Sequence, residues 1–205
     1  MKICVGIDPS INSSGVSLLF FNDENELQKE LFFLIRGTDH LTKREKEAAE
    51  KYADKFKYVA YGKYDIAMAE DNHEAEYQKT LNMIAIVDHI WDVVEHYVDY
   101  DDKVYIVQEG VSYGSSIRTK SIFDLAGLNY LLRMRFIKSL YHNMNFTIAT
   151  PSEIKKFTTG NGNCKKDQMI ELFKALHPGF DLPKLDDIAD SYWMANFAKK
   201  IMIGC

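Results

Sequence analysis

The sequence predicts a mixed α/β fold in which antiparallel and then parallel strands form one sheet with helices on both faces. Three apolar stretches separated by short polar turns open the chain, at residues 3–8, 16–21 and 31–35. Two shorter apolar stretches, at residues 104–107 and 146–149, alternate with longer amphipathic segments. Strands joined by short turns pair antiparallel, and strands that alternate with helices pair parallel.

The opening meander is indicated by its side-chain pattern and by its turns. Ile3, Val5 and Ile7 alternate with smaller residues, as expected of a strand. Pro, Asn, Ser and Gly are frequent at positions 9–15, and Asn and acidic residues fill positions 22–25. These residue types favour tight turns, so the three strands are predicted to be sequential neighbours.

Residues 38–75 differ in composition from the stretches on either side. Lys, Glu and Ala crowd positions 42–57, which predicts a solvated helix, whereas positions 58–65 are aromatic and positions 70–76 are acidic. We interpret residues 38–75 as an insertion or surface subdomain within a single domain that spans residues 1–205, a length that suits one hydrophobic core.

The remaining helices are predicted from apolar periodicity and from start and stop signals. Amphipathic patterns cover residues 77–97, about 121–141 and 165–176. Pro151 opens a short helix before the last of these. The final helix is expected to begin at Asp186 or Asp187 and to end near residue 202.

The charge balance limits the possible partners without deciding among them. A formal net charge of −5 and a pI of about 5.7 argue, taken alone, against a nucleic-acid partner. A site that chelates divalent metal needs several carboxylates, however, and the bound metal reverses the local sign. The distribution of Lys and Arg therefore matters more than their total.

The sequence predicts neither export nor membrane insertion. No apolar run is long enough to span a bilayer, and Asp8 interrupts the first apolar stretch, so the start does not resemble a signal peptide. Cys4, Cys164 and Cys205 are far apart and form no CxxC pair, which favours free thiols over a zinc site or a redox motif. We expect the cytosol, of a bacterium or of an infected host cell.

Acidic residues stand at the ends of three predicted elements. Asp8 ends the first strand, Glu109 follows a later apolar strand, and Asp187 and Asp190 share one face at the start of the last helix. A buried, unpaired carboxylate is costly, so something positive is expected among them. Local roles stay open: a turn at Asp8, a solvated strand end at Glu109 and an N-cap at Asp186.

Together, these acids predict a divalent-metal site. Hard oxygen ligands suit Mg²⁺, with Mn²⁺ as a substitute, rather than zinc. Two such ions about 4 Å apart can hold the attacking and leaving oxygens of a phosphodiester. Asp8, Glu109, Asp187 and Asp190 are therefore predicted to be metal ligands and catalytic residues, with two ions in the site.

A glycine loop between pairs of lysines is the second chemical motif. Glycines let the backbone approach a phosphate closely, and lysines neutralise phosphates. Alone, the segment is better explained as a solvated charged turn, but together with four acids in this order phosphate binding becomes the favoured interpretation. Its predicted DNA-binding residues are Lys155, Lys156, Gly160, Gly162, Lys165 and Lys166.

The polar loop after Glu109 supplies further candidates for DNA binding. Tyr113 is predicted to stack on an unpaired base, and Arg118 and Lys120 are predicted to hold phosphates.

These motifs resemble those of the RuvC family of Holliday junction resolvases. Gly-Ile-Asp-Pro-Ser at residues 6–10, followed by Gly15, resembles the opening of the family, and Glu109 is similar to its second acid. The final acid pair and the Lys, Gly-x-Gly, Lys pattern match at Asp187, Asp190, Lys155, Gly160, Gly162 and Lys166. The likeness covers roughly residues 1–35 and 77–200. Members of the family carry an aromatic residue near this point. The position in this sequence that matches it directly is Ser112, and Tyr113 is one residue later.

The resemblance implies a ribonuclease H-like fold and a metal-dependent crossover junction endodeoxyribonuclease. It further implies a homodimer that nicks two strands of like polarity at a four-way junction, with other branched DNA as possible substrates. Residues 38–75 have no obvious counterpart in bacterial resolvases, and the pI is unusually acidic. Both departures fit a phage or viral relative with a broader choice of branched DNA.

The sequence also predicts a surface that seals against a second copy of the chain. Apolar residues, including Trp91, surround much of the 77–97 helix, and a second apolar helix covers residues 121–141. The alternative is that residues 38–75 cover this surface within one chain.

Three other functions are alternatives to a resolvase. An actin-like or sugar-kinase ATPase also opens with a strand, an Asp and a hairpin, but needs two such domains, for which 205 residues are too few. A ribonuclease acting on RNA/DNA hybrids shares the fold and the metals, although the Lys-flanked Gly-x-Gly loop argues against it. A non-catalytic junction-binding protein should have lost one or more of the four acids.

Overall fold

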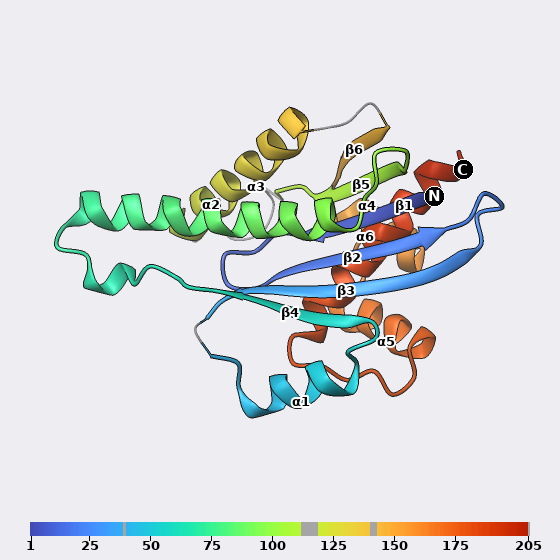
Figure 1. The fold of residues 1–205 in the computed structure, drawn as a ribbon, viewed down its shortest axis with the longest axis horizontal. Helices are drawn as coiled ribbons and strands as arrows, with labels where there is room; N and C mark the ends of the chain where they lie inside the picture. The colour runs from blue at the N-terminus through green and yellow to red at the C-terminus, as the bar shows by residue number, and fades with distance from the viewer. Residues whose placement is uncertain (39, 112–118, 140–142, 205) are drawn as a thin grey trace.

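The computed structural model describes residues 1–38, 40–111, 119–139 and 143–204, which form one mixed sheet with helices on both faces (Figure 1). The sheet order is β4-β3-β2-β1-β5-β6. β1, β2 and β3 pair antiparallel, whereas β5 pairs parallel with both β1 and β6, so the predicted fold class is confirmed. The strands are β1 (Lys2–Asp8), β2 (Ser14–Phe21), β3 (Leu27–Gly37), β4 (Phe56–Tyr61), β5 (Lys103–Glu109) and β6 (Met144–Ala149).

The helices divide between the two faces of the sheet and enclose two apolar clusters. One cluster lies between the sheet and α2 and α3, and contains Trp91, Leu132 and Phe136. The other lies under α4, α5 and α6, and it includes Ala48 of α1 and Tyr52, the residue after that helix. The helices are α1 (Lys43–Lys51), α2 (Asn72–His96), α3 (Thr119–Ser139), α4 (Pro151–Thr159), α5 (Lys166–Leu176) and α6 (Leu185–Ile203), with a short 3₁₀ turn η1 (Ile66–Met68).

The 38–75 stretch contains a strand that the sequence did not predict. The helix expected over residues 42–57 ends at Lys51, and β4 follows it and pairs parallel with the outer edge of β3. The reason is tertiary: Phe56 is fully buried against Phe32 and Phe180, and the Tyr52 hydroxyl donates to the carbonyl of Gly179. Local helix propensity is overridden by this aromatic packing.

A capping box holds α1 in place. Thr42 caps the helix by accepting from the backbone N–H of Glu45, and the carboxylate of Glu45 accepts in return from the backbone of Thr42. Glu45 is buried and pairs with Arg36 of β3. The helix is therefore fixed to the sheet at its first turn.

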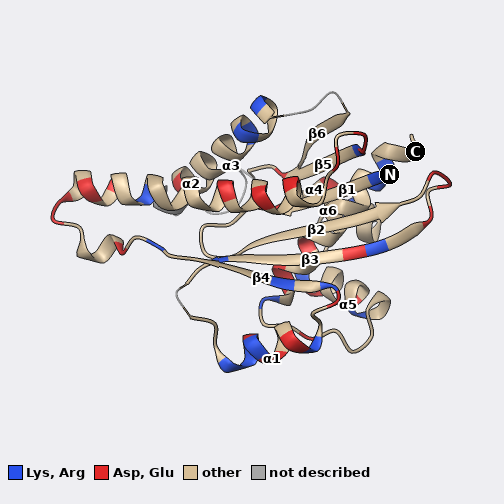
Figure 2. Ribbon diagram, viewed as in Figure 1, with Lys and Arg blue, Asp and Glu red and all other residues tan. Residues whose placement is uncertain are grey.

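An arm formed by residues 62–82 extends beyond the end of the sheet (Figure 1). It consists of the chain leaving β4, η1 and the first turns of α2, which begins at Asn72, five residues earlier than predicted. The buried amide of Asn82 closes the arm: it accepts from the backbone N–H of Tyr64 (2.9 Å) and donates to the backbone carbonyl of Tyr64 (3.1 Å). Acidic residues gather at its outer end (Figure 2).

In the part of the chain that the structure describes, every helix is too short or too polar to cross a membrane.

Candidate active site

Three of the predicted acids line one pocket of about 270 Å³. Asp8 ends β1 and Glu109 ends β5, and because these strands are parallel neighbours, their carboxyl ends lie at the same edge of the sheet. Asp190 reaches the pocket from α6, which crosses the face of β1 and β2. The pocket is also lined by Pro151, Ile154, Lys155, Lys166, Met169 and Met194.

Two glycines allow α6 to lie directly on the sheet. A Cβ atom on Gly6 would lie 1.9 Å from the carbonyl oxygen of Ser191, and one on Gly15 would lie 2.1 Å from that of Asp187. No real side chain tolerates such distances, so only glycine permits this approach. A buried hydrogen bond of 2.7 Å between the hydroxyls of Ser17 and Ser191 fixes the register of helix and strand.

The pocket carries an excess of buried negative charge. Burial raises the pKa of Asp8 well above its ordinary value, and the neighbouring charges of Glu109, Asp190 and Asp187 raise it further. Burial and the charge of Asp190 also raise the pKa of Glu109. Burial raises the pKa of Asp190 even though Lys166 opposes that shift. Like charges held together out of water favour binding a cation.

Asp187 lies beside this group without lining the pocket. Its charge still raises the pKa of Asp8, and burial raises the pKa of Asp187 itself, while the hydroxyl of Ser13 lowers it. The Ser13 hydroxyl is buried and faces the carboxylate of Asp187, whose charged form it stabilises. Nothing in the sequence singles out Ser13, which is one of several small polar residues in that turn.

The N-cap role considered for Asp186 is wrong. α6 begins at Leu185, and its N-cap position is Lys184, in the left-handed conformation with φ of 61° and with no side-chain capping bond. Asp186 instead pairs with Lys166, at 3.1 Å.

Two of the predicted DNA-binding lysines, Lys155 of α4 and Lys166 of α5, line the acid pocket. The Lys166 ammonium pairs with Asp190 (2.9 Å) as well as with Asp186. Although burial opposes the shift, these carboxylates raise the pKa of Lys166, so it remains charged. The pocket therefore places positive charge beside its carboxylates.

The rest of the glycine loop lies outside the pocket. Lys156 and Lys165 are exposed. Gly160 ends α4 in the left-handed conformation, with φ of 78°, and a Cβ atom on Gly162 would lie 3.1 Å from the carbonyl oxygen of Ser152. Local backbone structure therefore accounts for the presence of glycine at both positions. Contact of Gly160 and Gly162 with DNA stays a prediction.

The predicted contacts in the loop after Glu109 are not settled by the structure. Tyr113 and Arg118 lie outside the described residues, and Lys120 lies in the first turn of α3, where its side chain is not among those described.

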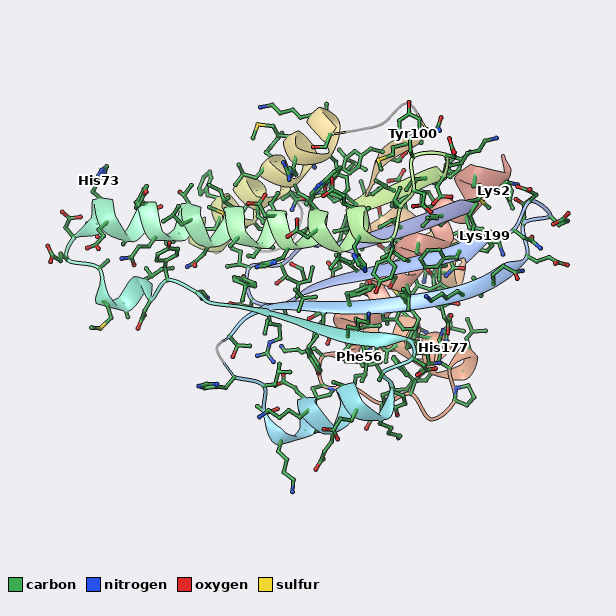
Figure 3. All side chains as sticks on the ribbon, in the orientation of Figure 1. Lys2, Phe56, His73, Tyr100, His177 and Lys199 are labelled. Atoms are coloured by element: carbon green, nitrogen blue, oxygen red, sulfur yellow. The ribbon has the colours of Figure 1, made fainter. Side chains whose placement is uncertain are left out.

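The residues present fit a divalent cation. Their donors are carboxylate oxygens from Asp8, Glu109 and Asp190, the ligand type preferred by Mg²⁺ and Mn²⁺. Within the described residues, no three His, Cys, Asp or Glu side chains are already arranged as a coordination shell. Among the described residues, no histidine lines the pocket: Figure 3 shows His73 at the outer end of α2, whereas His177 packs against Phe173 and Glu30.

The mixed sheet has a ribonuclease H-like fold, with acids at the ends of β1 and β5 and on the helix that crosses them. No protein-family model matches the chain. The chain is 29 % identical over 106 residues to the crossover junction endodeoxyribonuclease RuvC of Dictyoglomus thermophilum, a match that covers 51 % of this chain and 63 % of that protein. It is 39 % identical over 54 residues to RuvC of Rickettsia typhi, covering 26 % of this chain and 34 % of that protein.

Solved structures agree in fold over nearly the whole chain. Thermus thermophilus RuvC superimposes with a TM-score of 0.55 at 11 % identity, covering 98 % of this chain and 96 % of that one. The yeast mitochondrial Holliday junction resolvase Ydc2 superimposes with a TM-score of 0.52 at 15 % identity, covering 96 % and 77 %. The resemblance to RuvC that the motifs indicated is confirmed, in sequence over about half of the chain and in fold over almost all of it.

Proposed function

We propose that this chain is a metal-dependent endonuclease that cuts branched DNA, four-way junctions above all, by hydrolysing phosphodiester bonds. The observation that carries the proposal is the convergence of Asp8, Glu109 and Asp190 from three separate elements in one pocket that Lys155 and Lys166 border. The sequence likeness to crossover junction endodeoxyribonucleases supports the reaction class. T. thermophilus RuvC, similar in fold, has been solved with a Holliday junction substrate, which supports the choice of substrate.

The acids would hold Mg²⁺ or Mn²⁺, which supplies charge stabilisation and an activated water at the scissile phosphate. Asp8, Glu109 and Asp190 supply the ligands, and Asp187, close enough to Asp8 to raise its pKa, completes the proposed set. Their fixed positions follow from the two strand ends and from the close seating of α6. Lys155 and Lys166 would orient the DNA backbone by pairing with its phosphates.

Two symmetric cuts in one junction require two sites, and the described residues of each chain form one such acid pocket. We therefore propose a homodimer. Trp91, which the sequence analysis included in the possible contact surface, is fully buried in the monomer, so it does not contribute to that surface. Exposed apolar side chains do remain on α3, at Phe123, Tyr130 and Ile137. The chain leaves them uncovered over the residues described, and burying them is a reason for two copies to associate.

The test is a cleavage assay on labelled four-way, three-way, flap and RNA/DNA hybrid substrates with Mg²⁺ or Mn²⁺. We expect paired nicks in the four-way junction and no cleavage without a divalent cation. The matched variants Asp8→Asn, Glu109→Gln and Asp190→Asn should bind the junction while cutting it at least about a hundredfold more slowly, since such metal sites contribute several kcal/mol. Preferred cleavage of the hybrid would replace the proposal with a ribonuclease, and binding without cleavage would leave a junction-binding protein.

A further inference from the structure

The side chain of Lys166 joins an acid inside the pocket to an acid outside it. Its Nζ lies 2.9 Å from Oδ2 of Asp190 and 3.1 Å from Oδ2 of Asp186. Asp190 lines the pocket together with Asp8 and Glu109, and Asp186 does not. The Lys166 ammonium is therefore shared between Asp190, a proposed metal ligand, and Asp186, which has no role in the proposed reaction.

The two carboxylates lie along α6 in order of increasing exposure to solvent, from Asp190 to Asp186. Asp186 and Asp190 are four residues apart, so their side chains are neighbours on one face of the helix. The side chain of Asp190 is 18 % exposed and that of Asp186 is 39 % exposed, so the second acid lies nearer to solvent. Lys166 has a long flexible stem, and rotating it outward keeps its ammonium beside a negative charge.

A divalent cation would compete with Lys166 for Asp190. Both are positive, both need the same carboxylate, and like charges held so close together repel each other. When the cation binds, Lys166 must give up Asp190. Without Asp186, its ammonium would be left unpaired beside a cation, which would weaken cation binding and release the side chain from the site.

On the basis of the proposed function, we infer that Asp186 is a positioning residue that keeps Lys166 at the mouth of the pocket once a divalent cation occupies Asp190. There the ammonium remains available to a substrate phosphate. The role belongs to Asp186 because it is the second carboxylate that contacts Lys166 among the described residues. It is not explained by helix capping, because Lys184 occupies the N-cap.

The first test measures the affinity of the full-length, DNA-free protein for Mn²⁺ by calorimetry. Asp186→Asn should weaken binding about three- to fivefold, the size of one partly exposed ion pair, because Lys166 then has only Asp190. In a Lys166→Met background, the same substitution should change the affinity less than twofold. With Lys166 present, the conservative variant Asp186→Glu should bind Mn²⁺ as tightly as the wild type. Equal weakening in both backgrounds would show that Asp186 acts through its own charge, and no weakening in either would equally overturn the inference.

A second measurement needs neither cation nor DNA. Asp190→Asn imitates an Asp190 whose charge is already neutralised, and the rate of Lys166 acetylation, followed by mass spectrometry, reports whether the ammonium is still held. We expect slow labelling in Asp190→Asn and labelling several-fold faster in Asp186→Asn/Asp190→Asn, with the exposed Lys165 as internal control. Equal rates in the two variants would refute a role for Asp186, even in an active nuclease. If the acetylation rates are as expected but the protein cuts no branched DNA, the pairing of Lys166 with Asp186 stands and only the proposed function is refuted.

Discussion

The carbonyl oxygen of Asp187 occupies the space that a Cβ atom on Gly15 would need, at a distance of 2.1 Å. This contact fixes how closely the first turn of α6 approaches β2. Since Asp187 and Asp190 both belong to the first turns of α6, the absence of a side chain at position 15 sets where two of the four proposed acids lie relative to Asp8.

Replacing Gly15 with Ala should push α6 off the sheet. The added methyl group meets backbone rather than a flexible side chain, so we expect destabilisation of about 1–3 kcal/mol and loss of junction cleavage. Thermal unfolding and the cleavage assay measure both effects. The control is Gly127→Ala on α3, where a Cβ would meet only Met83 at 3.7 Å; it should be neutral or stabilising. A fully active Gly15→Ala variant would contradict the packing argument.

Neutralising one buried acid should stabilise the protein in the absence of divalent cations. Asp8→Asn removes a carboxylate whose pKa is raised by burial and by its acidic neighbours, so repulsion in the folded state is relieved. A gain of about 1 kcal/mol corresponds to a rise in Tm of about 2–4 °C for a chain of this size. Scanning calorimetry in EDTA measures it, with the exposed Asp54→Asn as control. A lowered Tm would mean that the acids do not repel one another.

Lys155 should contribute one phosphate contact. It lines the acid pocket, so Lys155→Ala is expected to weaken junction binding and to reduce the salt dependence of the affinity by about one counterion. Binding titrations at several salt concentrations measure the slope. Lys199→Ala is the matched control, because Lys199 does not line the pocket. It lies over the ring of Phe21, at the end of the sheet where β1 begins (Figure 3). Equal slopes for wild type and Lys155→Ala would remove Lys155 from the DNA contact.

The arm should loosen when Asn82 is replaced by Leu. The substitution leaves the backbone N–H and carbonyl of Tyr64 without the partners that they have at 2.9 and 3.1 Å. We expect a loss of about 1–3 kcal/mol and faster proteolysis between residues 62 and 71. Limited proteolysis with mass spectrometry locates the cuts, and Asn145→Ala on β6 is an exposed control. Unchanged cleavage within the arm would show that Asn82 does not hold it.

Cys4 should be unreactive in the native protein. Its side chain is fully buried in β1, and burial raises the pKa of its thiol to about 12, although Lys199 opposes the shift. Reactive thiolate is therefore scarce at pH 8. In a Cys164→Ser/Cys205→Ser background, a thiol reagent should label Cys4 only after denaturation in urea. Rapid labelling without denaturant would mean that β1 opens locally.

The sequence by itself determined the parts of the molecule that depend on neighbouring residues. Alternating apolar side chains and turn residues predicted β1, β2 and β3, and the positions of Asp8 and Glu109 directly after apolar strands predicted two proposed ligands at one sheet edge. Such signals are local, since strand period and turn chemistry span only a few residues.

Contacts between distant residues were decided by the tertiary structure alone. β4 forms because aromatic side chains from Tyr52 after α1, from β4 and from the segment before α6 pack together, which overrides the helical composition around it. The seating of α6 on Gly6 and Gly15 makes Asp190 line the pocket and leaves Asp187 beside it, although the two acids share one helix face. Likewise, Asp186 faces Lys166 rather than capping its own helix. Sequence spacing gives the face on which a side chain lies, but only packing decides what that face meets.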